Sequence, residues 1–425
     1  MKNDIFSAFE SEVRIYCRQF PAVFHRSIGS SLFDESGREY IDFLSGAGAL
    51  NYGHNHPAMV QALIQYLQAG GLLQSLDLHT TAKRQFLELL YRNVIEPRKL
   101  NYKVQFTGPT GSSAVEAALK LARRITGRQG VVAFTNAYHG MSLGALSATG
   151  NRAKRAASGL TLTGVSHMPF DNFLGNAIST APLLDQMLTS SGSGVDLPAA
   201  IILETIQAEG GVNVASKSWL QHIAQICVKH EIMLVVDEIQ TGCGRTGPFF
   251  SFEDVGIAPD IVCLSKSIGG AGLPMALVLF KAELDQWQPG EHTGTFRGNN
   301  LAFVAGAIAL DLFWASDSLE KEVRRKGDFL REQLEGIAAA YPEHSSMVRG
   351  RGLLQAIAWD HPGFAMAVSR SCFEKGLVVE TCGPNDHVLK LLPPLTIADE
   401  ALSVGVGIIR EAIATTQYSS RSTQS

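Results

Sequence analysis

The segment Ile232-Met-Leu-Val-Val-Asp-Glu-Ile-Gln-Thr-Gly242 places an unbroken apolar run directly before an aspartate. Such a run, bounded by polar residues, is typical of a strand that is buried on both faces of a parallel sheet. Asp237 stands at the carboxyl end of this strand, the edge at which open α/β sheets bind their ligands. Because a buried carboxylate is costly unless it meets a cation, Asp237 predicts a polar site at that edge.

A second segment, Asp260-Ile-Val-Cys-Leu-Ser-Lys-Ser-Ile-Gly-Gly270, repeats the pattern and ends in a lysine and a glycine-rich turn. Lys266 is a poor core residue, and its position is explained if the ε-amine is bonded as an imine. Pyridoxal phosphate needs both groups, a lysine to bond its aldehyde and an aspartate to keep its pyridine nitrogen protonated. A buried Lys–Asp ion pair, or two solvated strand-end charges, would explain either residue alone. Together they favour a pyridoxal-phosphate site in which Lys266 and Asp237 are catalytic.

The middle of the chain predicts an α/β fold with a mostly parallel central sheet. Helix-like stretches with an apolar period near 3.6 residues alternate there with short apolar runs, as in the helices expected over Ser113–Thr126 and Ser218–Lys229. The runs that predict further strands are Lys103–Phe106, Val131–Phe134, Ala199–Leu203 and Pro274–Phe280.

The C-terminal part has a different character, which predicts a smaller α+β domain. A charged helix over Leu319–Ala340 precedes short apolar runs, and a final helix is expected at Asp399–Ala414. We expect a large domain over residues 51–314 and a small domain built from residues 1–50 and 315–415. The Ser/Thr/Gln-rich tail, residues 416–425, is expected to be disordered. The short strands of the small domain are expected at Leu353–Trp359, Leu377–Glu380 and His387–Leu391.

A phosphate cradle is predicted where Gly108-Pro-Thr-Gly-Ser-Ser-Ala-Val-Glu116 opens the first of these helices. Glycine allows close backbone approach, and a helix N-terminus favours an anion, so Gly111 and Ser112 are the candidate phosphate ligands. A capping box between Ser113 and Glu116 is the simpler explanation, and both can hold together. Past the next strand, Phe134-Thr-Asn-Ala-Tyr-His-Gly140 places Tyr138 and His139 where an aromatic side chain can lie against the pyridine ring.

These segments resemble the class III (ornithine/4-aminobutyrate type) pyridoxal-phosphate aminotransferases of fold type I. The resemblance runs from Tyr40 to about Glu411. Its most specific pieces are Asn51-Tyr-Gly-His-Asn-His-Pro57, Glu204-Thr-Ile-Gln-Ala-Glu-Gly-Gly211, Val236-Asp-Glu-Ile-Gln-Thr-Gly-Cys-Gly-Arg-Thr-Gly247, Leu264-Ser-Lys-Ser267 and Thr295-Phe-Arg-Gly-Asn-Asn300.

The resemblance implies a role for each matching residue. Lys266 bonds the cofactor and moves the proton, while Asp237 partners the pyridine nitrogen. Thr295 is implied to reach the phosphate of the neighbouring subunit, and Glu209 to help the site take two different substrates. The cofactor contacts that it implies are Gly111, Ser112, Tyr138, His139, Glu204, Asp237, Gln240, Lys266 and Thr295.

Within that family, Glu10-Ser-Glu-Val-Arg-Ile-Tyr-Cys-Arg-Gln-Phe-Pro21 and Glu291-His-Thr-Gly-Thr-Phe-Arg-Gly-Asn-Asn300 resemble the diaminobutyrate-forming branch of ectoine biosynthesis. This implies reversible amino transfer from L-glutamate to L-aspartate 4-semialdehyde. Many class III enzymes carry an arginine where Lys390 stands here, and lysine lacks the two-pronged fork of arginine. We expect Lys390 or Arg297 to bind a substrate carboxylate, although Lys390 could equally be a solvated strand charge.

Several alternative functions stay open at this point. The substrates could instead be another ω-amino acid as donor or a specialised-metabolite carbonyl as acceptor, and the same fold could serve a racemase or an aminomutase. A degenerate binding module is a third alternative, which the presence of Lys266, Asp237 and the cradle disfavours.

The composition indicates which partners and which cellular location to expect. The 425 residues carry 36 basic and 40 acidic side chains and a net charge of −4, which does not favour nucleic-acid binding. Charged residues make up 18%, below the ~25% typical of soluble domains. This deficit favours a surface that is partly covered by another subunit, and the family resemblance, through Thr295, implies a homodimer or a higher homo-oligomer with a shared active site. The six cysteines show no CxxC pair, and no apolar run reaches the ~20 residues of a membrane span. Without a signal-peptide pattern, we expect a cytoplasmic enzyme with small-molecule substrates and no metal.

Overall fold

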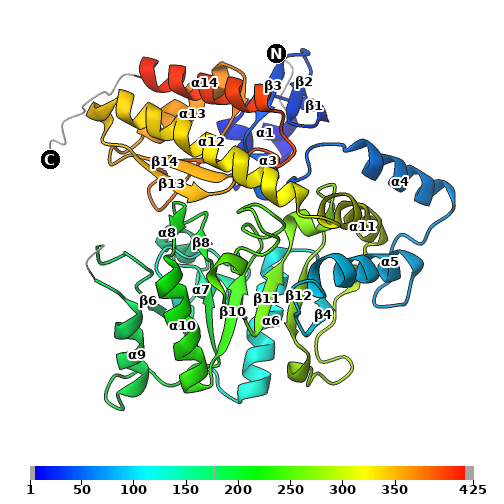
Figure 1. The fold of residues 1–425 in the computed structure, drawn as a ribbon, viewed down its shortest axis with the longest axis vertical. Helices are drawn as coiled ribbons and strands as arrows, with labels where there is room; N and C mark the ends of the chain where they lie inside the picture. Colours follow the sequence, from blue (N-terminus) through cyan, green and yellow to red (C-terminus); the bar gives the residue numbers. More distant parts are fainter. Residues whose placement is uncertain (1–4, 176–177, 417–425) are drawn as a thin grey trace.

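The computed structural model describes residues 5–175 and 178–416. Figure 1 shows one large sheet with flanking helices in the lower part of the molecule, and smaller sheets with helices α12–α14 above it. This is the fold type I architecture, so the predicted α/β class is confirmed. The predicted tail lies almost wholly outside the described residues.

The large sheet has seven strands in the order β4-β12-β11-β10-β7-β5-β6. All neighbours pair in parallel except β12, which runs antiparallel to both β11 and β4. Residues of the central strands are nearly all fully buried, as expected of a sheet covered on both faces. The strands are β4 (Tyr102–Phe106), β5 (Val131–Phe134), β6 (Val165–Met168), β7 (Ala200–Leu203), β10 (Met233–Asp237), β11 (Ile261–Leu264) and β12 (Leu277–Lys281).

The register of β10 and β11 brings the two predicted strand ends together. Asp237 stands directly opposite Cys263 in the parallel pair, so the chain leaves both strands at the same edge of the sheet. Lys266 follows two residues after the end of β11. The strand predicted from Pro274 begins only at Leu277, because proline has no N–H to donate and the carbonyl of Met275 accepts from Ser265 Oγ at 2.9 Å.

Helix α6 (Gly111–Thr126) begins two residues before the start predicted from the sequence. Thr110, not Ser113, is the N-cap, and its hydroxyl accepts from the amide of Ser113 at 3.2 Å. Glu116 does not reach back to close a capping box. Its carboxylate accepts instead from Ser142 Oγ at 2.6 Å and from the amide of Ala145 at 3.1 Å. The helix therefore begins at Gly111, which places Gly111 and Ser112 in its first turn.

The smaller sheets join the two ends of the chain. Strand β3 (Glu39–Asp42) pairs in parallel with β15 (Leu377–Val378). Figure 1 shows β3 and the other blue strands, β1 (Phe24–Ile28) and β2 (Ser31–Asp34), beside helices α12–α14. The predicted strand Leu377–Glu380 is divided, because β15 belongs to this sheet and β16 (Glu380–Cys382) to another. The second sheet has the order β13-β14-β17-β16. Its other three strands are β13 (Met347–Arg351), β14 (Leu354–Ala358) and β17 (Val388–Leu391). The predicted domain boundaries themselves stay a prediction.

The remaining long helices cover the sheets. Besides α6, the long helices are α4 (Pro57–Gln68), α10 (Lys217–His230), α11 (Asn300–Trp314), α12 (Ser318–Ala340), α13 (Phe364–Glu374) and α14 (Asp399–Thr415). No single helix of the described chain has both the length and the apolar character of a membrane span. Only α11 and α12 taken together meet that test, across a bend of 76°.

Candidate active site

Lys266 starts a short 3-10 turn immediately after β11, in a left-handed backbone conformation with φ of 54°. This conformation is uncommon for a residue other than glycine, and such residues cluster at functional sites. Its Nζ donates to the carbonyl of Ala47 at 2.8 Å. Enclosure by protein disfavours the ammonium form and lowers the pKa of Lys266 to about 8. An amine that is uncharged in part at neutral pH is suited to bond a carbonyl.

Asp237 pairs with His139, not with Lys266. Asp237 Oδ2 lies 2.8 Å from His139 Nδ1, and Asp237 Oδ1 accepts from the amide of Ile239 at 3.0 Å. Burial works against a charged imidazole, but the hydrogen bond to Asp237 and the charge of that carboxylate outweigh it, so the pKa of His139 is raised. No ion pair joins Lys266 to Asp237 among the described residues, so the alternative of a Lys–Asp pair does not hold.

One pocket of about 180 Å³ gathers these side chains. Glu204 forms part of its wall and accepts from the amide of Tyr138 at 3.0 Å, while burial raises the pKa of Glu204 to about 8. The ammonium group of Lys154 lies over the ring of Tyr138, 4.4 Å from the ring centroid. The lining residues are Gly111, Ser112, Tyr138, His139, Gly140, Glu204, Glu209, Asp237, Ile239, Gln240, Thr241 and Lys266.

Glu209, which lines this pocket, belongs to a buried cluster around Lys390. The Lys390 side chain is fully buried, so the alternative of a solvated strand charge is wrong. Its Nζ contacts Glu209 Oε1 closely and lies 3.1 Å from Glu380 Oε1. Burial opposes the charge of Lys390, but the two carboxylates outweigh it and hold the pKa of Lys390 well above its ordinary value. Gln240 joins this cluster to Lys266, because its Nε2 donates to Ala47 O at 2.8 Å and to Glu209 Oε1 at 3.2 Å.

Three predicted residues are absent from the lining of this pocket: Lys390, which contacts the lining residue Glu209, and Thr295 and Arg297. Thr295 and Arg297 belong to a short turn, Thr295–Gly298, whose backbone is held by Gln74 through the carbonyl of Thr295. Arg297 pairs with Asp77 and donates to the carbonyl of His292 at 3.2 Å. Neither residue lines the Lys266 pocket.

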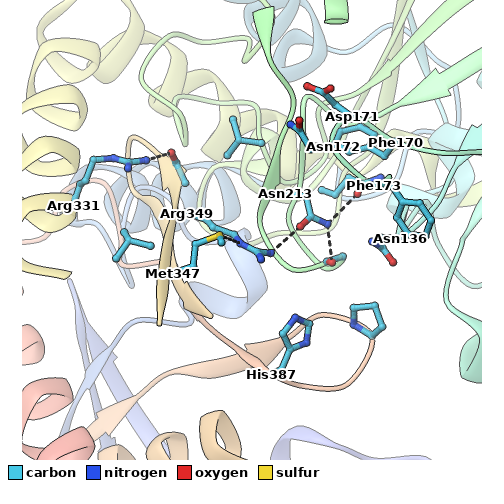
Figure 2. A pocket seen from close by; sticks show the side chains of 16 residues that line it. Asn136, Phe170, Asp171, Asn172, Phe173, Asn213, Arg331, Met347, Arg349 and His387 are labelled. Carbon is cyan, nitrogen blue, oxygen red and sulfur yellow. Dashed lines mark hydrogen bonds between the residues drawn. The ribbon is translucent and has the colours of Figure 1, made fainter. Parts of the chain in front are cut away.

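A larger cavity of about 660 Å³ lies elsewhere, and Figure 2 shows its lining side chains. Arg349 points into it and is held by the carbonyl of Gly211 at 3.2 Å and by Asn213 Oδ1 at 3.0 Å. No lysine stands among its lining residues, and it shares none with the Lys266 pocket. Size alone therefore does not mark the reaction site.

Comparison with known proteins identifies the family. Residues 16–413 match the family model described as aminotransferase class-III. The chain belongs to the class III aminotransferases. A diaminobutyrate–2-oxoglutarate transaminase of Nocardia farcinica is 55% identical over 414 residues, which cover 97% of this chain and 94% of that protein. A protein of the same name from Wolinella succinogenes is 55% identical over 409 residues, or 96% and 95% of the two chains.

A solved aminotransferase structure with lower sequence identity has the same fold. The ornithine aminotransferase of Toxoplasma gondii, described with partial occupancy of pyridoxal phosphate at its active site, superposes with a TM-score of 0.85. It is 27% identical, and the match covers 96% of this chain and 92% of that one. Class III aminotransferases are pyridoxal-phosphate enzymes, and the predicted cofactor is confirmed for this chain.

The pocket of this class III aminotransferase fits that cofactor. The amides of Gly111 and Ser112 stand in the first turn of α6, where N–H groups have no intrahelical partner and favour a phosphate. A Cβ on Gly111 would come within 3.0 Å of Ile239, and one on Gly140 within 2.2 Å of Ser112 Oγ, so glycine keeps this wall open. Lys266 and the Asp237–His139 pair line the same pocket. His139 Nε2 is buried and has no hydrogen-bond partner among the described residues.

Sequence reasoning missed Ala47, Glu380 and Tyr16 in this aminotransferase site. Glu380 had a usable signal, since it ends the apolar run Leu377-Val-Val and is a buried carboxylate like Asp237. Ala47 acts only through its carbonyl, which no side-chain pattern reveals. Tyr16 donates to Glu380 Oε2 at 3.3 Å from a distant part of the chain, and nothing local indicates this contact.

Proposed function

We propose that this aminotransferase moves an amino group from L-glutamate to the aldehyde of L-aspartate 4-semialdehyde, giving L-2,4-diaminobutyrate and 2-oxoglutarate. The observation that carries the choice of substrates is the 55% identity, over nearly the whole chain, to proteins that bear the name of this reaction. The family match over residues 16–413 spans the pocket and the cluster that contacts it.

We assign the chemistry to Lys266 and the Asp237–His139 pair. Pyridoxal phosphate, when bound, supplies an aldehyde that takes up the amino group and a ring that withdraws electrons. Lys266 would hold the cofactor through its Nζ, and the same amine, when free, would move the proton that leaves the substrate carbon bearing the amino group. Asp237 presents a carboxylate to the pyridine nitrogen, and His139 holds that carboxylate in place.

We assign the other pocket residues to binding and orienting the cofactor. Gly111 and Ser112 would hold the phosphate, Tyr138 would lie against the ring, and Gln240 would reach the ring hydroxyl. The presence of all of them in the lining of one pocket supports these assignments. Glu204 would keep its place near the cofactor through the amide of Tyr138.

We further propose a dimer that shares its active sites and acts in the cytoplasm. Thr295 and Arg297 lie away from their own pocket, and Phe296 between them is 67% exposed, which supports contact with a second subunit. In that arrangement Thr295 completes the phosphate site of the neighbouring subunit. Arg297 and Lys390 remain our candidates for a substrate carboxylate, and Lys390 would first have to leave Glu209. The six free cysteines are consistent with a reducing compartment.

The first half of the reaction tests this function. Protein loaded with the cofactor and given L-glutamate alone should form one 2-oxoglutarate per subunit and lose the absorption band of lysine-bound cofactor. Addition of L-aspartate 4-semialdehyde should restore the band and yield L-2,4-diaminobutyrate. Product formation without any amino donor would indicate a racemase or an aminomutase instead.

A further inference from the structure

The cavity of about 660 Å³ in Figure 2 lies between the large sheet and the β13-β14-β17-β16 sheet. One side is formed by segments that follow β5, β6 and β7, and the other mainly by β13 and the loop before β17. Its volume is within the range of about 300–1,000 Å³ that is typical of small-molecule sites. None of the residues assigned to the reaction lines it, so the reaction does not account for this cavity.

Arg349 brings a positive charge into the cavity without a carboxylate to balance it. Its Nη1 donates to Gly211 O at 3.2 Å and to Asn213 Oδ1 at 3.0 Å, and both acceptors are neutral. Within residues 5–175 and 178–416, Arg349 forms no ion pair and its Nη2 no hydrogen bond. Burial lowers the pKa of Arg349, as expected where a guanidinium is enclosed without an anion. A cation in this position favours the arrival of an anion.

His387 adds an unused hydrogen-bonding group near Arg349. Its Nδ1 is buried and has no hydrogen-bond partner in the part of the chain that the structure describes. Burial and the charge of Arg349 lower the pKa of His387, although the exposed carboxylates of Asp360 and Asp386 act in the opposite direction. The imidazole is therefore neutral at pH 7, and one of its nitrogens can donate a hydrogen bond to an anion.

The other charged residues of the lining are engaged elsewhere. Asp171, the one carboxylate among the described lining residues, accepts from the amide of Ser216 at 2.8 Å through its Oδ2. Arg331 forms an ion pair with Glu335, with 3.3 Å between Nη1 and Oε1. The charge of Asp171 is not among the causes that shift the pKa of Arg349. The part of the cavity around Arg349 is therefore positively charged.

Exposed apolar side chains border the same space. Phe173 and Met347, both in the lining, are 51% and 58% exposed. Figure 2 shows Met347 beside Arg349, and Phe173 on the opposite side of the opening. A ligand that covered these two side chains would gain free energy from the apolar surface that it removes from water. The lining thus favours a ligand with both an anionic group and an apolar part.

One stretch of backbone separates this cavity from the Lys266 pocket. Glu209 lines the pocket, and the next residue, Gly210, lines the cavity. A side chain of the cavity holds this stretch, since Asn213 Nδ2 donates to Gly210 O at 3.0 Å. A ligand in the cavity therefore lies outside the reaction site, and the cofactor can be bound at the same time.

We propose that this cavity is a second ligand site, which binds a small organic anion with a carboxylate or phosphate group on an apolar body. The anionic group accepts hydrogen bonds from Arg349 Nη2 and from the ring of His387. The apolar body lies against Phe173 and Met347. The site is separate from the reaction and does not depend on the substrates proposed above.

The test uses three molecules of similar shape on the cofactor-loaded protein: 4-bromobenzoate, 4-bromophenyl phosphate and the neutral 4-bromobenzamide. Isothermal titration calorimetry measures the Kd of each. We expect at least one of the two anions to bind about 10-fold or more tightly than the amide, because it accepts from a charged donor. The tighter anion shows whether the site recognises a carboxylate or a phosphate.

Three variants assign this binding to the cavity. Arg349→Gln removes the charge and should weaken the tighter anion about 10-fold or more, while the affinity for the amide stays within about twofold. Arg410→Gln makes the same change at an exposed arginine of α14 and should leave all three affinities within about twofold. Because Arg349 also holds the backbone at Gly211, Phe173→Ala gives an independent test. It removes an exposed apolar side chain and should weaken all three molecules about threefold or more.

The melting temperature and the cofactor absorption of each variant establish that it is folded and loaded. A crystal structure of the loaded protein with the tighter anion then locates the molecule, because bromine is identified by its anomalous scattering. Bromine beside Phe173, with the anionic group at Arg349, supports the proposal. Bromine only in the Lys266 pocket or only at a crystal contact overturns it. Equal affinity for the anions and the amide, equal effects of Arg349→Gln and Arg410→Gln, or no binding up to about 10 mM would also overturn it.

Discussion

At the scale of single residues, the site depends on how the charge of each buried group is balanced. Asp237 is held by His139 and by a backbone amide, so its carboxylate is oriented without help from Lys266. Among the described residues, the one hydrogen-bond partner of the Lys266 amine is thus a neutral carbonyl, which keeps the amine available for bonding. In the neighbouring cluster, Glu209 and Glu380 both contact the single ammonium group of Lys390.

The lowered pKa of Lys266 predicts how cofactor uptake depends on pH. Only the uncharged amine bonds an aldehyde, and enclosure lowers the pKa of Lys266 to about 8. The rate at which apoprotein captures pyridoxal phosphate should therefore rise with pH up to about 8 and level off above it. Stopped-flow absorption between pH 6 and 10 measures this rate. A rate still rising steeply above pH 9 would mean that the pKa of the amine is that of an ordinary lysine.

Replacement of Asp237 by Asn should separate orientation from charge. The variant removes the anion from the buried Asp237–His139 pair, so the pKa of His139 should fall. We expect kcat to drop about 100-fold or more. Steady-state kinetics and nuclear magnetic resonance titration of His139 measure the two effects. Asp260→Asn is the matched control, since Asp260 pairs with Lys281 beside the start of β11 and should leave kcat within about threefold. An Asp237→Asn enzyme with normal kcat would exclude the role given to this carboxylate.

These catalytic residues could be predicted from sequence because each follows an apolar run that must be a buried strand. Asp237 and Lys266 needed no long-range information beyond the parallel order of their strands. Tyr16 and Ala47 could not be predicted, because their contacts join residues about 360 and 220 positions apart, and no local pattern encodes such contacts.

At the scale of elements, the N-terminus of α6 connects the fold to the phosphate site. Thr110 caps the helix and leaves the amides of Gly111 and Ser112 in the first turn, beside the pocket. The sequence placed this helix correctly but not its cap, because Ser113 and Glu116 satisfy the capping pattern equally well. Glu116 is drawn away by Ser142 and Ala145, which belong to the segment after β5.

Removal of this cap should weaken both the helix and the cofactor site. Thr110→Ala should lower the free energy of unfolding of the apoprotein by about 1 kcal/mol and weaken cofactor binding, while Thr110→Ser should retain both. Urea denaturation and cofactor titration measure these effects. Ser216→Ala removes the cap of α10, a helix whose cap does not line the Lys266 pocket, and should leave cofactor affinity unchanged. Equal affinity in Thr110→Ala and the wild type would show that the first turn does not need its cap for phosphate binding.

Elements with mixed burial were harder to predict than buried ones. Strand β6 has the sequence Val-Ser-His-Met and lies at the edge of the large sheet, so it lacks the apolar run that marks the central strands. The segment from Leu377 to Glu380 reads as one strand, but its two halves pair in different sheets. Only the tertiary fold decides such a division.

At the scale of the whole molecule, a shared active site would explain the low content of charged residues. Thr295 and Arg297 matched the family pattern in sequence yet lie outside the pocket of their own chain. A single chain cannot reveal where a second subunit places them, so their roles stay a prediction. The charged fraction of 18% is consistent with a surface that is partly covered by a partner.

Complementation between two inactive variants tests the shared site. Lys266→Ala removes the bonding amine, and Thr295→Asp places a negative charge where the partner's phosphate is expected. If each site combines Lys266 of one subunit with Thr295 of the other, a hybrid dimer contains one intact site. An equal mixture, unfolded and refolded together, should recover about a quarter of the wild-type activity. Recovery of none, with hybrids present by native mass spectrometry, would contradict a shared site.

The most direct test of the central claim follows the transferred nitrogen. Cofactor-loaded protein is given L-glutamate labelled with nitrogen-15 and L-aspartate 4-semialdehyde, with Lys266→Ala as the control, and the products are identified by mass spectrometry. We predict label on the terminal nitrogen of L-2,4-diaminobutyrate, an equal amount of 2-oxoglutarate, and no turnover by the variant. Unlabelled product, or turnover by Lys266→Ala at the wild-type rate, would contradict amino transfer at Lys266.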